Sequence, residues 1–207
     1  LLRNQLSGQI PSEIGNLMNL TIFCTWGNQL SGEIPESIGN LSNLVWLYLH
    51  ENQLSGEIPE SISNLTNLTW LWLQENQLSG EIPESIDNLT NLVRLFLYNN
   101  QLSDQIPESI CNLTDLTWSS EYIDWDHSYI YDNNLCPPYP SCIEEYVGEQ
   151  DTSECPETTV TDYDGNTYET VQIGDQIWMA ENLKVTHYNN GDEIPTGLDY
   201  DAWTNPT

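Results

Sequence analysis

The sequence predicts a solenoid, a stack of similar structural units, followed by a small segment with mostly β-structure. The motif Asn-Gln-Leu-Ser-x-x-Ile-Pro recurs, and its first Asn stands at positions 4, 28, 52, 76 and 100, so the period is 24 without a slip. A fixed period between about 20 and 50 residues indicates one supersecondary unit per repeat. A single unit cannot bury its apolar side alone, so stacking of the units must supply the core.

Each unit is predicted to begin with a short strand, as in residues 44–52. Leu47 and Leu49 alternate with aromatic or polar residues, which is typical of a strand with one buried face. Asn52 ends this strand, and we expect its side-chain amide to be buried and to bond backbone groups that the turning chain leaves unpaired. The same structural position recurs at Asn28, Asn52, Asn76 and Asn100.

The return arm of the unit carries the next inward residues, Leu54, Ile58 and Ile62. Gly56 permits a tight bend, and Pro59 is incompatible with a long helix. We therefore expect this arm to be 3₁₀-helical or extended.

This pattern resembles the leucine-rich repeat family over residues 1–135. The run L-S-G-x-I-P after the Asn is similar to the plant-type subclass, which is typical of receptor ectodomains and is also found in bacterial secreted proteins. The resemblance implies a right-handed solenoid with a parallel β-sheet on its concave side. It also implies a protein partner.

The outward strand positions carry the functional prediction. In the frame L-x-x-L-x-L-x-x-N the x residues point to the concave surface. Neighbouring strands lie about 4.8 Å apart, so equivalent residues contact each other in columns. The columns are Ile22, Trp46, Trp70 and Arg94; Cys24, Tyr48, Trp72 and Phe96; Trp26, His50, Gln74 and Tyr98; and Gly27, Glu51, Glu75 and Asn99.

These columns predict a contiguous exposed patch of aromatic rings, and large exposed aromatic patches usually mark binding surfaces. The candidate ligand-binding residues are Trp26, Trp46, Tyr48, Trp70, Trp72, Arg94, Phe96 and Tyr98. A protein partner is the first hypothesis. A glycan is the second, since sugar rings offer apolar faces and hydroxyl donors. A third is an architectural spacer, in which ring packing only stabilises the strand ladder.

The charge balance excludes several partners. Three Lys and Arg against 32 Asp and Glu give a net charge of −29, which disfavours nucleic acid and anionic membranes. Like charges in stacked acidic columns repel each other, and salt screens this repulsion, so the protein should be more stable in salt. We expect divalent cations to act only as non-specific counterions. The columns are Glu33, Glu57 and Glu81, and Glu36, Glu60, Glu84 and Glu108.

No catalytic, cofactor-binding or metal motif was found, so we expect no enzyme activity and no cofactor. The repeat reads N-L-[ST], and we attribute most of the glycosylation sequons to this pattern. The sequons lie at Asn19, Asn40, Asn64, Asn67, Asn88 and Asn112.

The last repeat contains an insertion. Leu is missing at the expected positions Ser119 and Glu121, and the frame resumes at residues 131–135, about nine residues late. We expect an exposed acidic loop at 119–127. Metal ligation by Asp124, Asp126 and His127 is the weaker alternative, because no second ligand cluster follows at a matching spacing.

Residues 136–156 form a Cys- and Pro-containing segment and an acidic linker. The paired prolines Pro137 and Pro138 prevent continuation of the sheet. The segment resembles the cysteine-containing cap of extracellular solenoids, which implies disulfides and an oxidising compartment. Cys111, Cys136, Cys142 and Cys155 allow three pairings, of which we favour Cys111 with Cys136 and Cys142 with Cys155. Cys24 is expected to be free on the aromatic surface.

Residues 157–207 form the last segment. Asp164-Gly165 lies between two strand-like runs and predicts a hairpin. The runs at 161–168 and 173–183 resemble the start of the Fibrobacter-type major paralogous (FISUMP) domain of bacterial surface proteins. That family is longer, so this resemblance implies a truncated β domain.

The chain lacks an initiator Met and opens at Leu1, an inward strand position, so we expect a fragment whose N-terminal edge at Leu1 and Leu2 frays. Its longest apolar run is far too short to span a membrane. Together these features predict a non-enzymatic bacterial recognition protein, extracellular or at the cell surface.

Overall fold

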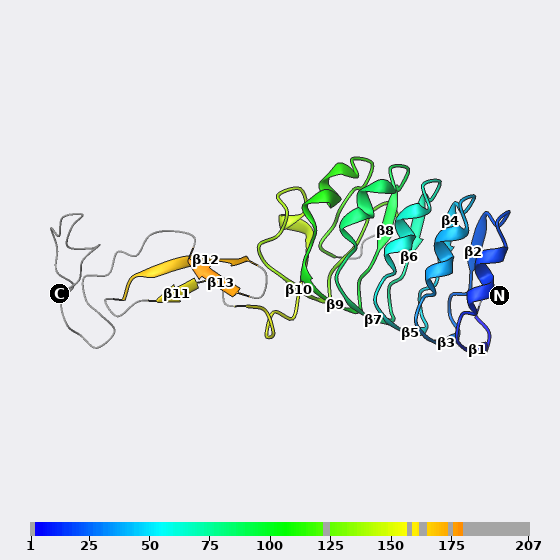
Figure 1. The fold of residues 1–207 in the computed structure, drawn as a ribbon, viewed down its shortest axis with the longest axis horizontal. Helices are drawn as coiled ribbons and strands as arrows, with labels where there is room; N and C mark the ends of the chain where they lie inside the picture. The colour runs from blue at the N-terminus through cyan, green and yellow to red at the C-terminus, as the bar shows by residue number, and fades with distance from the viewer. Residues whose placement is uncertain (1–2, 122–124, 157–158, 162–164, 174–175, 180–207) are drawn as a thin grey trace, which may run out of the picture. The chain divides into compact units, whose positions relative to one another are not determined.

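The computed structural model describes residues 3–121, 125–156, 159–161, 165–173 and 176–179. The chain divides into two compact units, Leu1–Cys155 and Pro156–Thr207 (Figure 1). None of the helices within those ranges is both long enough and apolar enough to cross a membrane. The expectation about Leu1 and Leu2 falls outside the described residues.

The first unit is a solenoid with two parallel sheets and a row of 3₁₀ helices (Figure 1). One sheet holds the strands predicted from the Leu alternation. Its members are β2 (Ile22–Cys24), β4 (Trp46–Tyr48), β6 (Trp70–Trp72) and β8 (Arg94–Phe96). The registers align Trp46 with Ile22 and Trp70, and Tyr48 with Cys24 and Trp72. These two predicted columns are therefore confirmed.

A second parallel sheet was not predicted. Its strands are β1 (Ser7–Gly8), β3 (Gln29–Gly32), β5 (Gln53–Gly56), β7 (Gln77–Gly80), β9 (Gln101–Gln105) and β10 (Asn134–Cys136). A typical strand, β5, buries only Leu54 and ends at Gly56 with φ +76°. With one apolar residue beside a left-handed glycine, the segment lacks the alternation of apolar and polar residues that would predict a strand. Stacking of identical repeats, rather than local sequence, brings these extended segments together.

The rest of each return arm is a 3₁₀ helix, as expected. The helices are η1 (Ser12–Asn16), η2 (Glu36–Asn40), η3 (Glu60–Asn64), η4 (Glu84–Asn88) and η5 (Glu108–Asn112). In η3 the Ile62 N–H donates to the Pro59 carbonyl at 2.9 Å and the Leu65 N–H to the Ile62 carbonyl at 3.1 Å. Pro59, with φ −64°, fits the helix entrance and lacks the N–H that a preceding helical turn would need.

The apolar core runs along the stack between the sheets and the helices. Leu54, Ile58, Ile62, Leu65 and Leu68 are between 0 and 4% exposed, as their inward positions predict. Fully burying such a side chain stabilises the fold by about 1.5–3 kcal/mol. Because each repeat contributes the same set, the core is continuous from one unit to the next.

The repeated Asn side chains form a hydrogen-bonded ladder beneath the strand ends. Asn52 Nδ2 donates to the carbonyls of Thr25 (3.1 Å), Leu49 (3.0 Å) and His50 (3.1 Å). Its Oδ1 accepts from the Leu30 N–H at 3.0 Å. Each amide thus joins its own repeat to the preceding one. Asn28, Asn76, Asn100 and Asn133 make the corresponding bonds.

The insertion length is confirmed by this ladder. Asn133 takes the place of the repeated Asn, 33 positions after Asn100 and so nine more than the period. Tyr129 forms a parallel bridge with Phe96 and so continues the column of Tyr48 and Trp72.

The cap closes the C-terminal end of the first unit with two disulfides, and the favoured pairing is wrong. Cys111 bonds Cys142, and Cys136 bonds Cys155. Ile143 is fully buried, so the chain after the prolines folds onto the end of the core and brings Cys142 to η5. The spacing of cysteines carries no information about that turn. Cys24 is free and half-buried.

The described part of the second unit is a three-stranded antiparallel sheet of β11 (Thr159–Thr161), β12 (Thr167–Ile173) and β13 (Gln176–Met179). Thr161 pairs with Thr167, and Gly165 between them has φ +81°, as a tight hairpin requires. Tyr168 is fully buried. Much of the FISUMP-like motif, from Ala180 onward, lies outside the described residues.

Candidate functional site

The candidate site is the outward surface of the four-stranded sheet, which we call the aromatic face. It comprises Trp26, Trp46, Tyr48, His50, Trp70, Trp72, Phe96, Tyr98, Tyr129 and Tyr131. The parallel registers place rings from successive repeats against each other. Ring centroids of Tyr48 and Trp72 lie 4.6 Å apart, and those of Trp72 and Phe96 lie 4.8 Å apart with planes inclined by 3°.

One half of this face is covered, contrary to the expectation of a contiguous exposed patch. Phe96 is 0% exposed and Trp72 only 9%. Trp125, from the insertion, stacks on Trp72 with ring centroids 5.1 Å apart and lies 6.3 Å from Phe96. We call Trp72, Phe96 and Tyr129 the covered half.

Arg94, one of the predicted ligand-binding residues, contacts the insertion. Its Nε donates to the Trp125 carbonyl at 2.9 Å, and its Nη2 lies 3.3 Å from the Asp126 carboxylate. Its Nη1 donates to the Val93 carbonyl at 2.7 Å. The loop is therefore more than an exposed acidic segment, because Arg94 orients a tryptophan that closes half of the face.

The structure gives the metal alternative no support within its described ranges. They contain no group of three or more His, Cys, Asp and Glu side chains that could hold a metal ion. Asp126 faces Arg94, and Asp124 lies outside the described residues.

The other half of the aromatic face is open. Trp46 is 38% exposed and Ile22 is 44% exposed, while Trp26, Tyr48 and Trp70 are half-buried. We call the platform of these four rings, together with the neighbouring Ile22, the open half. The rings of Trp46, Tyr48 and Trp70 lie 5.8 to 6.2 Å from one another, and Ile22 is aligned with Trp46 on the next strand. His50 connects Trp26 to Tyr48.

Buried polar atoms without a partner lie beside this platform. His50 Nδ1, Trp72 Nε1 and Gln74 Oε1 have no hydrogen-bond partner among the described residues. The His50 ring stacks on Trp26 at 5.2 Å with planes inclined by 9°. Burial, followed by the positive charge of Arg3, lowers the pKa of His50 to about 4, so the imidazole is neutral at pH 7. The predicted columns place these residues on the outward surface of the sheet, but the sequence alone does not show that their side chains are buried.

Burial also affects the ionisable groups of the next column. It raises the pKa of the Cys24 thiol and that of the Tyr48 phenol. Cys24 is therefore a protonated thiol at neutral pH and a poor nucleophile.

Two carboxylates border the open half. Glu51 and Glu75 occupy equivalent positions in adjacent repeats, both in left-handed backbone conformation with φ +52° and +56°. Burial, and then the charge of Glu51, raises the pKa of Glu75. The border of the platform thus carries two neighbouring carboxyl groups.

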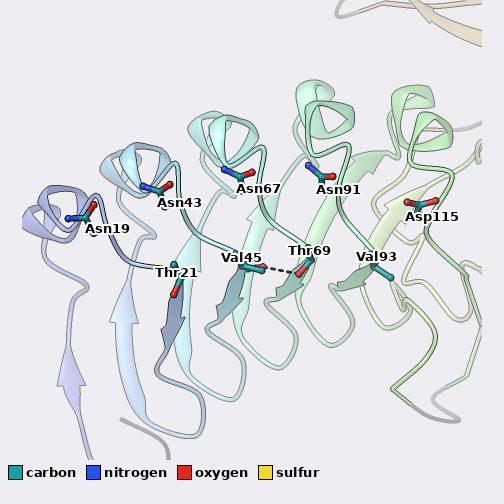
Figure 2. Close-up of a pocket in the computed structure, with 9 residues that line it drawn as sticks. All are labelled: Asn19, Thr21, Asn43, Val45, Asn67, Thr69, Asn91, Val93 and Asp115. Carbon is teal, nitrogen blue, oxygen red and sulfur yellow. Dashed lines mark hydrogen bonds between the residues drawn. The ribbon is translucent and has the colours of Figure 1, made fainter.

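A polar groove of about 840 Å³ lies elsewhere on the first unit, along the turns that lead from the 3₁₀ helices into the strands (Figure 2). Its lining repeats with the period of the chain: Asn19, Asn43, Asn67, Asn91 and Asp115 in one row, and Thr21, Val45, Thr69 and Val93 in the other. Asn67 Nδ2 donates to the Ser42 carbonyl at 2.8 Å, and Asn43 and Asn91 make the same contact to Met18 and Thr66. These amide donors bond one repeat to the next.

A stack of parallel strands and 3₁₀ helices with a fixed period is the architecture of a repeat protein. Models of leucine-rich repeats match residues 15–78 and 66–117. The chain belongs to the leucine-rich repeat family. No curated protein sequence matched it.

Solved structures of plant proteins are similar to the first unit. The ectodomain of the receptor kinase GASSHO1/SCHENGEN3 from Arabidopsis thaliana, in complex with CASPARIAN STRIP INTEGRITY FACTOR 2, is 41% identical with a TM-score of 0.60. The similarity covers 65% of this chain and 15% of that one. A structure of the BIR3–SERK2 complex from Arabidopsis thaliana is 36% identical with a TM-score of 0.55, over 69% of this chain and 71% of that one.

A plant ice-binding protein is also similar, with 34% identity and a TM-score of 0.57 over 65% of this chain and 41% of that one. The chain spans only about 15 to 21% of the length of the first four receptor structures that it matches. What these structures share with the chain is the repeat architecture.

Proposed function

We propose that this protein is a non-enzymatic recognition module, extracellular or at the cell surface, whose open half binds a segment of a protein partner. The carrying observation is that five apolar or aromatic residues form one accessible platform, four of them on the aligned strands β2, β4 and β6 and the fifth, Trp26, just after β2. A rigid sheet holds this platform, so binding would require little ordering of the protein itself.

One further observation supports a protein partner, and another supports the location. Ectodomains with this fold are solved in complex with peptide hormones, including RGFR1 with RGF2 and HAESA with an IDA peptide. The two disulfides suit an oxidising environment, which supports secretion or surface display. The L-S-G-x-I-P subclass and the FISUMP-like segment are part of the same proposal and would place the protein on a bacterial surface.

The test is a parallel screen of the 207-residue chain against a displayed random-peptide library and a polysaccharide panel, followed by titrations of tryptophan fluorescence. We expect saturable peptide binding that is lost in Trp46→Ala/Trp70→Ala. Both rings are accessible, so the variant should keep its fold, which circular dichroism would check. Thr21→Ala, an exposed position in the polar groove, is the matched control and should bind like the parent.

Other outcomes decide between the alternatives. Binding to a polysaccharide alone, again lost with both tryptophans, would replace the protein partner with a glycan. No binding in either screen, together with a clear loss of stability in the tryptophan variant, would favour a spacer in which the rings only stabilise the sheet.

A further inference from the structure

An arginine of the chain itself lies on the open half. The guanidinium carbon of Arg3 is 4.6 Å from the centroid of the Trp26 ring. Its charge also contributes to the lowered pKa of His50, whose ring stacks on Trp26. A cation over an indole face is attracted by the negative face of the ring. The protein thus contains its own example of a guanidinium on this surface.

Two later positions of the same column are acidic. Arg3, Gly27, Glu51 and Glu75 occupy equivalent places in successive repeats and all have positive φ, at 41, 67, 52 and 56°. Because the backbone conformation is shared, the side chains of Glu51 and Glu75 start from the same rim as that of Arg3. Neither carboxylate has an ion-pair or hydrogen-bond partner among the described residues.

Buried acceptors lie next to these carboxylates in the chain. Gln74 is 2% exposed and His50 is 5% exposed, and each carries a polar atom without a partner within the described ranges. Gln74 Oε1 and an ionised carboxylate accept hydrogen bonds and cannot donate them. Neutral His50 accepts at Nδ1 when its proton is on Nε2. A buried acceptor without a donor is unfavourable, so a ligand that supplies donors is favoured here.

Resting on the proposed function, we infer that the open half docks an arginine side chain of the partner protein. Its guanidinium would lie between the Glu51 and Glu75 carboxylates, with one face on the aromatic rings. This group has five N–H donors, no acceptor and a flat surface that stacks on rings, whereas a lysine ammonium is a point charge that does not. A net charge of −29 attracts such a partner from a distance.

The probe is a set of peptides with one arginine beside an apolar residue, each paired with a citrulline and a lysine version. Citrulline keeps the shape of arginine and removes its charge. Titration of the full chain at physiological salt should show arginine peptides binding about tenfold more tightly than citrulline peptides, with lysine between them. Equal binding of arginine and citrulline versions would overturn the inference.

Two double variants with the same change in charge test the position. Glu51→Gln/Glu75→Gln should abolish the preference for arginine. Glu57→Gln/Glu81→Gln removes exposed carboxylates from the same two repeats and should retain it. An equal loss in both would mean general electrostatic attraction and would refute the site.

The failure of the site can be separated from that of the proposed function. Peptides that bind through Trp46 and Trp70 without regard to arginine would leave the proposed function intact and refute this inference alone. No peptide binding by the parent, or binding that survives Trp46→Ala/Trp70→Ala, would refute the proposed function itself.

Discussion

The open and covered halves of the aromatic face are built from the same strand positions and yet differ in solvent access. Trp46 and Trp72 both face outward on adjacent strands, but one is 38% exposed and the other 9%. The difference comes from the nine-residue insertion, whose Trp125 stacks on Trp72 and Phe96. One irregular repeat thus decides which part of a regular surface is accessible to solvent.

The comparison also separates two roles for aromatic residues. In the covered half the rings behave as a second, smaller core, with Phe96 and Tyr129 fully buried. In the open half they form a platform bordered by Glu51 and Glu75. Stability should therefore depend on the covered half and binding on the open half.

The largest predicted difference is between two tryptophan-to-alanine substitutions. Trp72→Ala should lower the free energy of unfolding by about 3–5 kcal/mol, because it leaves a cavity under Trp125. Trp46→Ala should lower it by about 1 kcal/mol or less, since its ring is already in contact with water. Urea denaturation followed by circular dichroism measures both. Equal losses would mean that the two halves do not differ energetically.

The disulfide-bonded cap should contribute nearly as much to the free energy of unfolding as Trp72. Cys111→Ser/Cys142→Ser opens a loop with a sequence separation of 31 and should cost about 3–4 kcal/mol by the chain-entropy relation. Cys24→Ser is the control and should change stability by about 0.5 kcal/mol or less, because Cys24 is unpaired. Peptide mapping without reduction checks the pairing directly. A Cys111–Cys136 fragment would contradict the structure.

His50, between the two halves, should make stability depend on pH. Its pKa is about 4 in the folded protein against an ordinary 6.5, so the unfolded chain binds more protons between these values. The stabilising effect of neutral His50 is full above about pH 6.5 and declines as the pH falls toward 4, by about 2–3 kcal/mol in total.

The pH effect is measured as the difference in unfolding free energy between the parent and His50→Gln, at about pH 7.5 and about pH 4.5. Titration of the glutamates is common to both proteins and cancels. We expect the advantage of the parent to shrink at the lower pH. A difference that does not change with pH would show that His50 stays accessible to protons in the folded state.

The sequence was sufficient for the repeat and its columns, because a strict period fixes which residues are equivalent. Alternation around Leu47 identified the buried side, and Pro59 limited the return arm to short 3₁₀ turns. The second sheet was missed, since its strands β3, β5, β7 and β9 contain one buried Leu each and no alternation. The disulfide pairing was wrong, because it depends on how the chain turns after Pro138.

The main error about the site has a single physical cause. Trp125 lies in a segment with many acidic residues, and composition favoured a solvated loop. Arg94, whose nearest neighbours in its column are Trp70 and Trp46, donates a hydrogen bond to the Trp125 carbonyl, and Trp125 stacks on Trp72. An isolated arginine in an aromatic column, followed by an insertion, is the sequence pattern that would have predicted this contact.

The smallest predicted effect tests this closure directly. Arg94→Gln removes the bond to the Trp125 carbonyl and the pair with Asp126, and should cost about 1 kcal/mol, because Asp126 is 85% exposed and the pair is well hydrated. Its informative readout is local: the Tyr129 N–H, bonded to the Leu95 carbonyl at 3.0 Å, should exchange with deuterium faster once Trp125 no longer covers the strands. Asp126→Asn keeps the backbone contact and should leave that exchange nearly unchanged. If Arg94→Gln also left it unchanged, stacking of Trp125 alone would hold the covered half closed, and Arg94 would be free to take part in ligand binding.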